Sequence, residues 1–367
     1  MRIHGWSGSA LAILLFLGTG AAGPGRLHAG PASGSTLPGG AQPGTSAIQA
    51  GALGALALQP QDDAAAAGET KAPEISIEAA RVEGELRALH VRVGEASFTT
   101  LHLDGRIPYL HPVLAPSGAP TTRGFPMEPG PLDARDHPHH QSLWVAHGDV
   151  AGLDFWHDPE CSIRLAGAPR IEGGRVTLPL EWVGPNERVV LRETRRLAFG
   201  TEGDRRWFDQ RCEFVAAEEG VTFGDTKEGT FAVRLRPELR VDGEHAVGTL
   251  RSSEGREGKA TWGKPARWMH CEGVVGDERL GVTLVDHPRN PRFPTRWHAR
   301  TYGLVAANPF GLHHFTGSAR GEGALPVGTK EPVTFQHRFV LRSSPKSSPG
   351  PDAATLDAEA KAWAEGS

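Results

Sequence analysis

The sequence predicts an all-β protein built as a large antiparallel β-sandwich. Apolar and polar residues alternate in four segments, 175–183, 188–199, 206–216 and 333–342, as they do in strands with one buried face. Turn signals rich in Gly, Asn and Asp recur between such segments. The 47 glycines and 29 prolines interrupt the chain too often for long helices. A body of this size and pattern favours two broad packed sheets.

The first 29 residues have the profile of a secretory signal peptide. A basic start (Arg2) precedes an apolar run at 10–17 and then small residues, and cleavage is expected after Ala22 or after Ala29. The run is shorter than the roughly 20 residues that span a bilayer. We therefore predict a periplasmic or secreted protein with no membrane span in the mature chain. The alternative is a start codon assigned too far upstream of a cytoplasmic protein.

Composition divides the rest of the chain into three parts. Residues 30–73 are mostly Gly, Ala, Ser, Pro and Gln, and they cannot bury enough apolar surface to offset the entropy of ordering, so they are predicted to be a disordered linker. Residues 74–343 form the predicted β-sandwich domain. Residues 344–367 are predicted to be a flexible tail in which an Ala-rich segment suits a short helix.

Charge and cysteine content exclude several classes of protein. The formal net charge is −4 with both signs interspersed, and the sequence has no basic block of the kind that binds nucleic acid. Cys161, Cys212 and Cys271 are widely separated, so they form no CxxC metal motif and no disulfide framework. They are predicted to form at most one bridge or to remain buried free thiols.

The stretch 133–156, DARDHPHHQSLWVAHGDVAGLDFW, carries the strongest functional signal. It holds four of the 17 histidines and two of the nine tryptophans. Imidazoles beside carboxylates supply general acids and bases near neutral pH, and flat indole faces suit sugar rings. Pro138 excludes a regular helix and with it the two-histidine helical zinc motif, while a strand and a loop both remain open for His139 and His140. The alternative for each residue is a hydrogen-bonding brace of a loop.

Three later segments, 223–235, 285–303 and 306–315, have the same character. Their polar residues are Asp225, Lys227, Glu228, Asp286, His287, Asn290, Trp297, His298, Arg300, Asn308, His313 and His314. Long polar loops held on a β scaffold are a usual place for binding and catalysis. Each segment alone is also explained as a solvated loop, but four of them on one scaffold favour a shared site.

A resemblance to a known family rests on four motifs in order: DHPHHQSLWVAHGDVAGLDFW, FGDTKEGTFAVR, DHPRNPRFPTRWHARTYG and AANPFG. Together they resemble the secreted bacterial family labelled PmoA-like, or methane oxygenase PmoA, over residues 100–340. The resemblance implies a fold similar to the β-supersandwich of galactose mutarotases and a place near sugar-handling oxidoreductases. Methane oxygenase activity is not expected, because the membrane methane monooxygenase subunit crosses the bilayer several times and this body has no apolar run long enough to do so.

The first hypothesis, which the resemblance implies, is a secreted carbohydrate-active enzyme. Mutarotase-like sites use a histidine as proton donor and a carboxylate as base. Mapped onto this chain, the acid is His139 or His140 and the base is Asp225 or Glu228. The residues that would contact the sugar are Trp144, Trp156, Lys227, His298, Arg300 and Asn308. Epimerase, lyase and hydrolase activity all remain open, and the substrate is a sugar, a keto-sugar or another small molecule.

The second hypothesis is a metalloprotein, with a divalent metal as the cofactor instead of none. The candidate ligands for zinc, copper or iron are His137, His139, His140, His147, His287 and His298, with Asp136 or Asp286. No ligand spacing of high specificity is present among them.

The third hypothesis is a non-catalytic module that presents a tryptophan-lined surface to a glycan. A binding module does not need the density of titratable groups seen here, so this density favours an enzyme.

Overall fold

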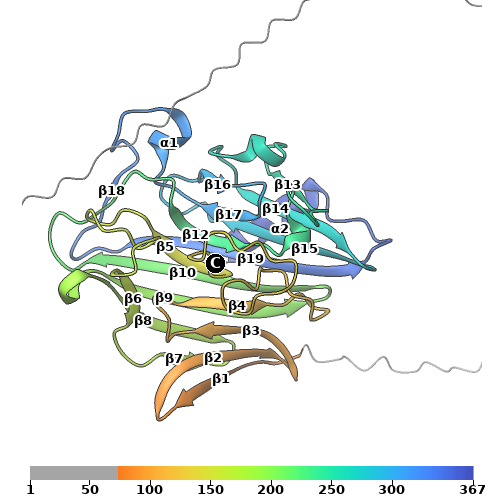
Figure 1. The fold of residues 1–367 in the computed structure, drawn as a ribbon, viewed down its shortest axis with the longest axis horizontal. Helices are drawn as coiled ribbons and strands as arrows, with labels where there is room; N and C mark the ends of the chain where they lie inside the picture. The colour runs from red at the N-terminus through yellow and green to blue at the C-terminus, as the bar shows by residue number, and fades with distance from the viewer. Residues whose placement is uncertain (1–72, 367) are drawn as a thin grey trace, which may run out of the picture. The chain divides into compact units, whose positions relative to one another are not determined.

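The computed structural model describes residues 73–366. The predicted signal peptide and all but the last residue of the predicted linker lie outside the described residues. The predicted all-β class is confirmed, because two large antiparallel sheets pack into a sandwich (Figure 1). None of the helices in this part of the chain is long and apolar enough to cross a bilayer.

One layer is an eight-stranded sheet, formed mainly by the N-terminal strands and by short strands from the middle of the chain. In spatial order it consists of β1 (Ile75–Val82), β2 (Glu85–Val93), β3 (Ala96–His102), β4 (Tyr109–Val113), β5 (Leu143–His147), β12 (Gly229–Arg234), β17 (Leu304–Ala307) and β16 (Trp297–Ala299). Residues that are distant in sequence meet where β5, β12, β17 and β16 pair.

The other layer is a nine-stranded sheet with long central strands. It consists of β13 (Thr249–Ser252), β14 (Trp268–Val275), β15 (Glu278–Asp286), β19 (Val333–Pro345), β10 (Arg205–Ala216), β9 (Arg188–Glu202), β8 (Arg175–Gly184) and β6 (Ser162–Leu165), with β7 (Arg170–Glu172) also paired to β8. A further two-stranded ribbon joins β11 (Thr222–Phe223) to β18 (Leu325–Pro326). The four strands predicted from alternation are β8, β9, β10 and β19, which lie side by side in this sheet (Figure 1).

Three 3-10 turns and two α-helices complete the described residues. The turns are Pro185–Glu187, Pro237–Leu239 and Gly258–Thr261, and the helices are α1 (Leu312–Thr316) and α2 (Ala353–Gly366). Helix α2 falls in the segment that we expected to be a flexible tail with a short helix. Its Leu356 and Trp363 are buried in a small cluster with Trp268 and Val285 of the nine-stranded sheet, so this helix covers part of that sheet.

Aromatic side chains fill the space between the sheets. Phe231 of β12 contacts Phe335 of β19 at 5.5 Å between ring centroids, and Phe98 of β3 meets Phe199 of β9 at 5.7 Å. Because strand residues alternate between faces, these contacts define which positions of each sheet point inward and which point away from the sandwich. All three cysteines are buried free thiols, and no disulfide bridge joins any two of them.

A buried ion pair also lies in this core. Glu193 and Arg195 face inward from β9, with Nε–Oε1 at 2.6 Å and Nη2–Oε2 at 2.9 Å, and neither side chain is more than 3% exposed. Trp182 of β8 donates its indole N–H to the same carboxylate at 2.8 Å. Removal of either charge would leave the other in the core without compensation.

Candidate functional site

Trp144 and His298, two of the predicted functional residues, lie on the outward face of the eight-stranded sheet. Strand register aligns Trp144 on β5 with Ala232 on β12, Ala306 on β17 and His298 on β16. The next position on β12, Phe231, points into the core, so this row points away from it. Adjacent strands lie about 4.8 Å apart, which places Trp144 and His298 roughly 14 Å from each other across two alanines.

Four flat rings form a column at the β5 end of this row. Tyr302 stacks on His137 (5.2 Å between centroids, 12° between planes), His137 on His140 (4.8 Å, 11°), and His140 on Trp144 (5.2 Å, 26°). Trp144 is at the buried end, and His137 is exposed. The column therefore connects solvent to the sheet surface through aromatic faces.

His139 and His157 flank this column. The ring of His139 makes T-shaped contacts with the rings of His140 and His157, each at 4.5 Å between ring centroids. Its centroid lies 6.4 Å from that of the Trp156 ring. We define the histidine cluster as His137, His139, His140 and His157 with the carboxylates Asp136 and Asp154.

A turn before β5 presents the two adjacent histidines together. His140 donates its backbone N–H to the carbonyl of His137 at 3.0 Å, and the strand begins only at Leu143. His137 (φ 45°) and Ser142 (φ 62°) both adopt left-handed backbone conformations. Such strain in non-glycine residues concentrates at functional sites. Of the two conformations left open by the sequence, the loop is the one observed.

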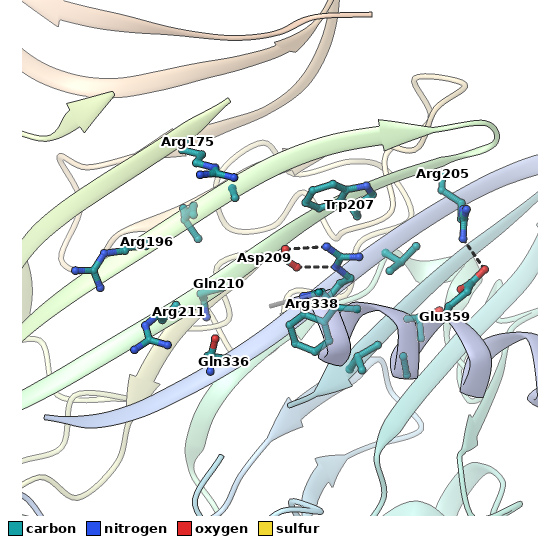
Figure 2. Close-up of a pocket in the computed structure, with 18 of the residues that line it drawn as sticks. Arg175, Arg196, Arg205, Trp207, Asp209, Gln210, Arg211, Gln336, Arg338 and Glu359 are labelled. Atoms are coloured by element: carbon teal, nitrogen blue, oxygen red, sulfur yellow. Dashed lines mark hydrogen bonds and ion pairs between the residues drawn. The ribbon is translucent and has the colours of Figure 1, made fainter. Parts of the chain in front are cut away.

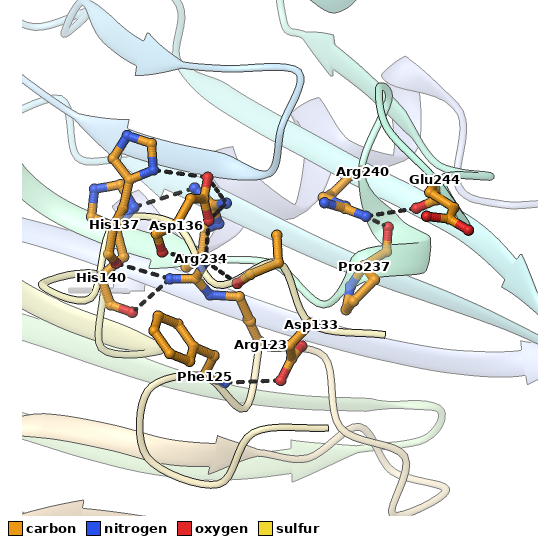
Figure 3. Close-up of polar contacts among 11 residues, drawn as sticks. Arg123, Phe125, Asp133, Asp136, His137, His140, Arg234, Pro237, Arg240 and Glu244 are labelled. Carbon is orange, nitrogen blue, oxygen red and sulfur yellow. Dashed lines mark hydrogen bonds and ion pairs between the residues drawn. The ribbon is translucent and has the colours of Figure 1, made fainter. Parts of the chain in front are cut away.

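Asp136 ties this turn to the sheet (Figure 3). Its carboxylate accepts from Arg123 at 2.5 Å, from Arg234 of β12 at 2.9 and 3.0 Å, and from His137 Nδ1 at 2.8 Å. The two guanidinium groups are only 2% and 1% exposed. Burial alone would raise the pKa of Asp136, but Arg234 and the other donors outweigh it and lower the pKa to about 2. Asp136 is therefore an anion at all pH values near neutrality.

Two histidines of the cluster are paired with carboxylates. His137 donates to Asp136 at 2.8 Å, and His157 donates from Nδ1 to Asp154 at 2.9 Å. All four side chains are about 40% exposed. A carboxylate that accepts from Nδ1 fixes the orientation of the ring and leaves Nε2 on its other side. Both pairs are therefore oriented, and both can contact a molecule in solution.

His139 and His140 are held neutral by their surroundings. Burial, aided by the neighbouring His157 and His137, lowers the pKa of His139 to about 4. Burial likewise places the pKa of His140 far below its usual value, and Arg234 faces its Nδ1 at 3.3 Å. Since a guanidinium can only donate, Nδ1 of His140 is the acceptor and its proton resides on Nε2.

Three nitrogen atoms beneath the cluster lack hydrogen-bond partners among residues 73–366. They are His139 Nε2, Trp144 Nε1 and Trp156 Nε1. The indole rings lie 5.1 Å apart, and both are almost completely buried, at 1% and 0% exposure. The two tryptophans predicted to stack on a sugar thus have no open face, and their N–H groups are the unsatisfied feature.

A second group of predicted residues gathers at the other end of the row. Lys227 pairs with Glu228, and the backbone carbonyl of Lys227 accepts from Nδ1 of buried His298 at 2.7 Å. Burial, the charge of Lys227 and that of Arg300 lower the pKa of His298 to about 3. Arg300 also lies over the ring of Tyr302 at 5.5 Å, so it connects this lysine cluster (Lys227, Glu228, His298, Arg300) with the aromatic column.

Four predicted site residues act as structural braces. Asp225 accepts backbone N–H groups from His313 and Gly323 at 3.0 and 2.9 Å, one on each oxygen. Asn308 donates to the carbonyls of Thr226 and Lys227 and accepts from Phe310 and Gly311. Buried His147 is bonded to the carbonyl of Gly224 and to Thr230, and buried His287 accepts from the backbone of Arg289. Asp225 is therefore not a free base, and neither it nor Glu228 contacts His139 or His140 in the described part of the chain.

The metal hypothesis finds no ligand set in this geometry. Within residues 73–366, no three His, Cys, Asp or Glu side chains are placed to hold one ion. His147 and His287, two of the proposed ligands, are instead engaged within the core and the loops.

Sequence reasoning missed three residues that shape the cluster. Arg123 and Arg234 hold Asp136 from 13 and 98 residues away, and His157 follows directly after the histidine-rich stretch. An Asp three residues before a His was a local signal for the second pair. The arginines had no comparable signal, because Arg234 reaches the cluster through the register of β12 and Arg123 through a loop whose backbone bonds to Arg234.

Comparison with known protein families shows which family this chain belongs to. A model described as a family of unknown function, DUF6807, matches residues 88–354. The chain belongs to this family. The DUF6807 match includes both clusters and most strands of both sheets. No curated protein matches the chain.

Proposed function

We propose that this DUF6807 protein is a carbohydrate-active enzyme that transfers protons at a sugar or keto-sugar bound over the histidine cluster. The observation that carries the proposal is a neutral imidazole, His139, in ring contact with a second imidazole that a carboxylate supports, His157 with Asp154. A neutral imidazole beside a second imidazole that is paired with a carboxylate supplies the two groups, a base and an acid, that general acid–base catalysis uses.

The geometry favours epimerisation or elimination over hydrolysis. Glycoside hydrolysis usually needs two carboxylates on either side of the bond. Here Asp136 is bound by two arginines and Asp154 by His157, so neither is a free carboxylate. In the proposed reaction His139 accepts a proton from a carbon next to a carbonyl group. His157 returns a proton to the same carbon or to a departing oxygen.

The surroundings of the cluster suit a polar, hydroxyl-rich substrate. The pairs His137–Asp136 and His157–Asp154 are about 40% exposed and offer hydrogen-bond donors and acceptors to such a molecule. Arg300 and Lys227, which is paired with Glu228, lie at the far end of the row and suit anionic or hydroxyl groups. The resemblance to PmoA-like proteins and to galactose mutarotases supports a sugar as the substrate class. We also propose that the chain is exported, which the basic start and the apolar run at 10–17 support.

Hydrogen exchange tests the proposal directly. Purified protein is incubated in D₂O with a panel of keto-sugars, and proton NMR follows loss of the signal at the carbon next to the carbonyl. We expect His139→Ala to lower the exchange rate by at least 100-fold, a normal loss for one acid–base group. His90→Ala, an exposed histidine on β2 without a role in the cluster, is the matched control. Equal exchange by wild type and His139→Ala would refute the assignment.

The pH profile gives a second readout. Because the pKa of His139 is lowered to about 4, the exchange rate should rise as pH increases through that value. An enzyme that used an ordinary exposed histidine as its base would show this rise about two pH units higher.

A further inference from the structure

A second site lies on the opposite side of the sandwich. A groove of about 1090 Å³ runs along the outward face of the nine-stranded sheet (Figure 2). Helix α2 borders it with Glu359 and Trp363, and the β7–β8 hairpin borders it with Arg170 and Glu172. The histidine cluster is on the other sheet, so this groove belongs to neither cluster described above.

Small residues in the middle of the sheet create the hollow. Strand register aligns Arg175, Ala198, Asp209 and Arg338 in one row across β8, β9, β10 and β19. In the next row Gly200 stands opposite Trp207. A Cβ atom at Gly200 would come within 2.2 Å of the indole, so the ring of Trp207 lies directly over the backbone of β9.

One end of the groove carries excess positive charge. Arg196 and Arg211 are cross-strand neighbours that share a single carboxylate, Glu213. Arg175 lies diagonally from Arg196, roughly 7–8 Å away, and is exposed with no partner among the described residues. On the other side of Arg175, Glu172 of β7 is its cross-strand neighbour and pairs with Arg170. Four guanidinium groups therefore face two carboxylates at this end of the groove.

The other end of the groove is electrically balanced and aromatic. Asp209 accepts two bonds from Arg338 at 2.6 and 2.7 Å. The guanidinium of Arg338 lies 4.2 Å from the ring centre of Trp207 and 5.4 Å from that of Trp363. This stacked pair holds the half-buried indole of Trp207 in a fixed position.

We propose that this groove binds an acidic oligosaccharide through its carboxylate groups. Guanidinium forks match carboxylates in geometry and charge, which assigns Arg175, Arg196 and Arg211 to the acidic groups. The indole of Trp207 lies between the backbone at Gly200 and the guanidinium of Arg338, so its half-exposed edge is the apolar surface that a sugar ring can contact. The volume equals or exceeds that of pockets for drug-sized ligands, so more than one sugar ring can enter.

The mixed charge of the groove favours such a glycan over nucleic acid. Six arginines line the groove, but so do the four acidic residues Glu172, Glu202, Asp209 and Glu359. A continuous phosphate backbone would meet these acids, whereas a glycan carries its charges at intervals between hydroxyl groups. Nucleic-acid sites instead show unbroken basic patches.

Calorimetric titration of the full chain tests this proposal. The probes are oligogalacturonate and oligomannuronate of four to six units, with neutral galactose oligomers of equal length as the comparison. We expect binding of at least one acidic probe, at least tenfold weaker binding of the neutral one, and tenfold weaker binding of the acidic probe at high salt. Arg175→Ala with Arg196→Ala should weaken acidic binding at least tenfold, and Trp207→Ala should weaken it severalfold.

Two control variants make the result specific. Arg192→Ala removes an exposed arginine from the same strand and face, outside the groove, and should change nothing. His139→Ala should also leave binding unchanged, so failure of the proposed reaction and failure of this site can be told apart. The proposal is overturned if neither acidic probe binds, or if the neutral probes bind as tightly as the acidic ones. It is also overturned if the double arginine variant binds the acidic probe as tightly as wild type does. Tighter binding of a single-stranded oligonucleotide than of either acidic glycan would overturn it as well.

Discussion

Replacement of Asp136 by Asn tests whether this carboxylate holds the histidine cluster to the sheet. The substitution keeps the shape of the side chain but removes the charge that faces two buried guanidinium groups. Arg123 keeps backbone carbonyls of the turn as acceptors, among them those of Ala134 and His137. Arg234 loses both of its bonds to a carboxylate.

The expected loss at pH 7 is about 3 kcal/mol. The lowered pKa of Asp136 corresponds to at most ~2.5 kcal/mol, and we reduce it to ~1 kcal/mol because the side chain is 39% exposed and solvent screens the pairing. The guanidinium of Arg234, left buried without a carboxylate, adds roughly 2 kcal/mol. For a body of about 290 residues the entropy of unfolding near the midpoint is about 0.6 kcal/mol per kelvin, so Tm should fall by roughly 5 °C.

Calorimetry at several pH values provides the assay. The folded-state pKa of Asp136 is depressed, so its stabilising contribution is present above about pH 4 and is lost as pH falls toward 2. The gap in Tm between wild type and variant should therefore narrow over that window. Asp133→Asn is the matched control, because Asp133 in the same loop accepts backbone N–H groups from Phe125 and Gly130 and should cost only about 1 kcal/mol. Equal Tm values for Asp136→Asn and wild type at pH 7 would refute the reasoning.

Two further predictions concern the stability of the body. Arg195→Met leaves Glu193 in the core without its partner and should lower the free energy of unfolding, measured by urea denaturation, by about 3–5 kcal/mol. The double variant Glu193→Leu with Arg195→Met should recover most of that loss. A double variant as unstable as the single one would contradict the ion-pair account. Stability should also fall as pH decreases from about 6.5 to 4. Burial lowers the pKa of His139 and His147 to about 4 and that of His298 to about 3, so in this range the unfolded chain binds protons that the native chain does not. A Tm that stays constant between pH 7 and 4.5 would show that these histidines are protonated in the fold.

The sequence predicted those features whose signals are local. Alternation over nine or more residues located β8, β9, β10 and β19, since long strands with one buried face repeat every second residue. The histidine-rich stretch located the cluster for the same reason, because His137, His139 and His140 lie within four positions.

The division of the predicted site into two clusters could not be read from the sequence. It depends on the pairing of β5 with β12 and of β17 with β16, which inserts Ala232 and Ala306 between Trp144 and His298. The role of Asp225 was hidden similarly, since its partners are backbone groups of α1 and of the loop after it, 88 and 98 residues later. The groove arginines appeared only as polar positions in alternating strands, and register alone showed that Arg196 and Arg211 are neighbours.

The outward face of the nine-stranded sheet carries arginines and that of the eight-stranded sheet carries histidines, so the two faces suit different chemistry. Arginine does not lose its proton near neutral pH, so Arg175, Arg196 and Arg211 can attract and orient an acid but cannot transfer protons. His139 is uncharged in its buried setting and can accept one. The sheets of a sandwich lie about 10 Å apart, and the side chains on both outward faces add to that distance. A single sugar unit therefore cannot touch both sites, and nothing in the shared, close-packed core requires that binding at one site alter the other. Groove affinity and proton exchange should accordingly vary independently across the variants, and a variant of the groove that changed exchange on a small keto-sugar would mean that the core transmits a structural change between the two faces.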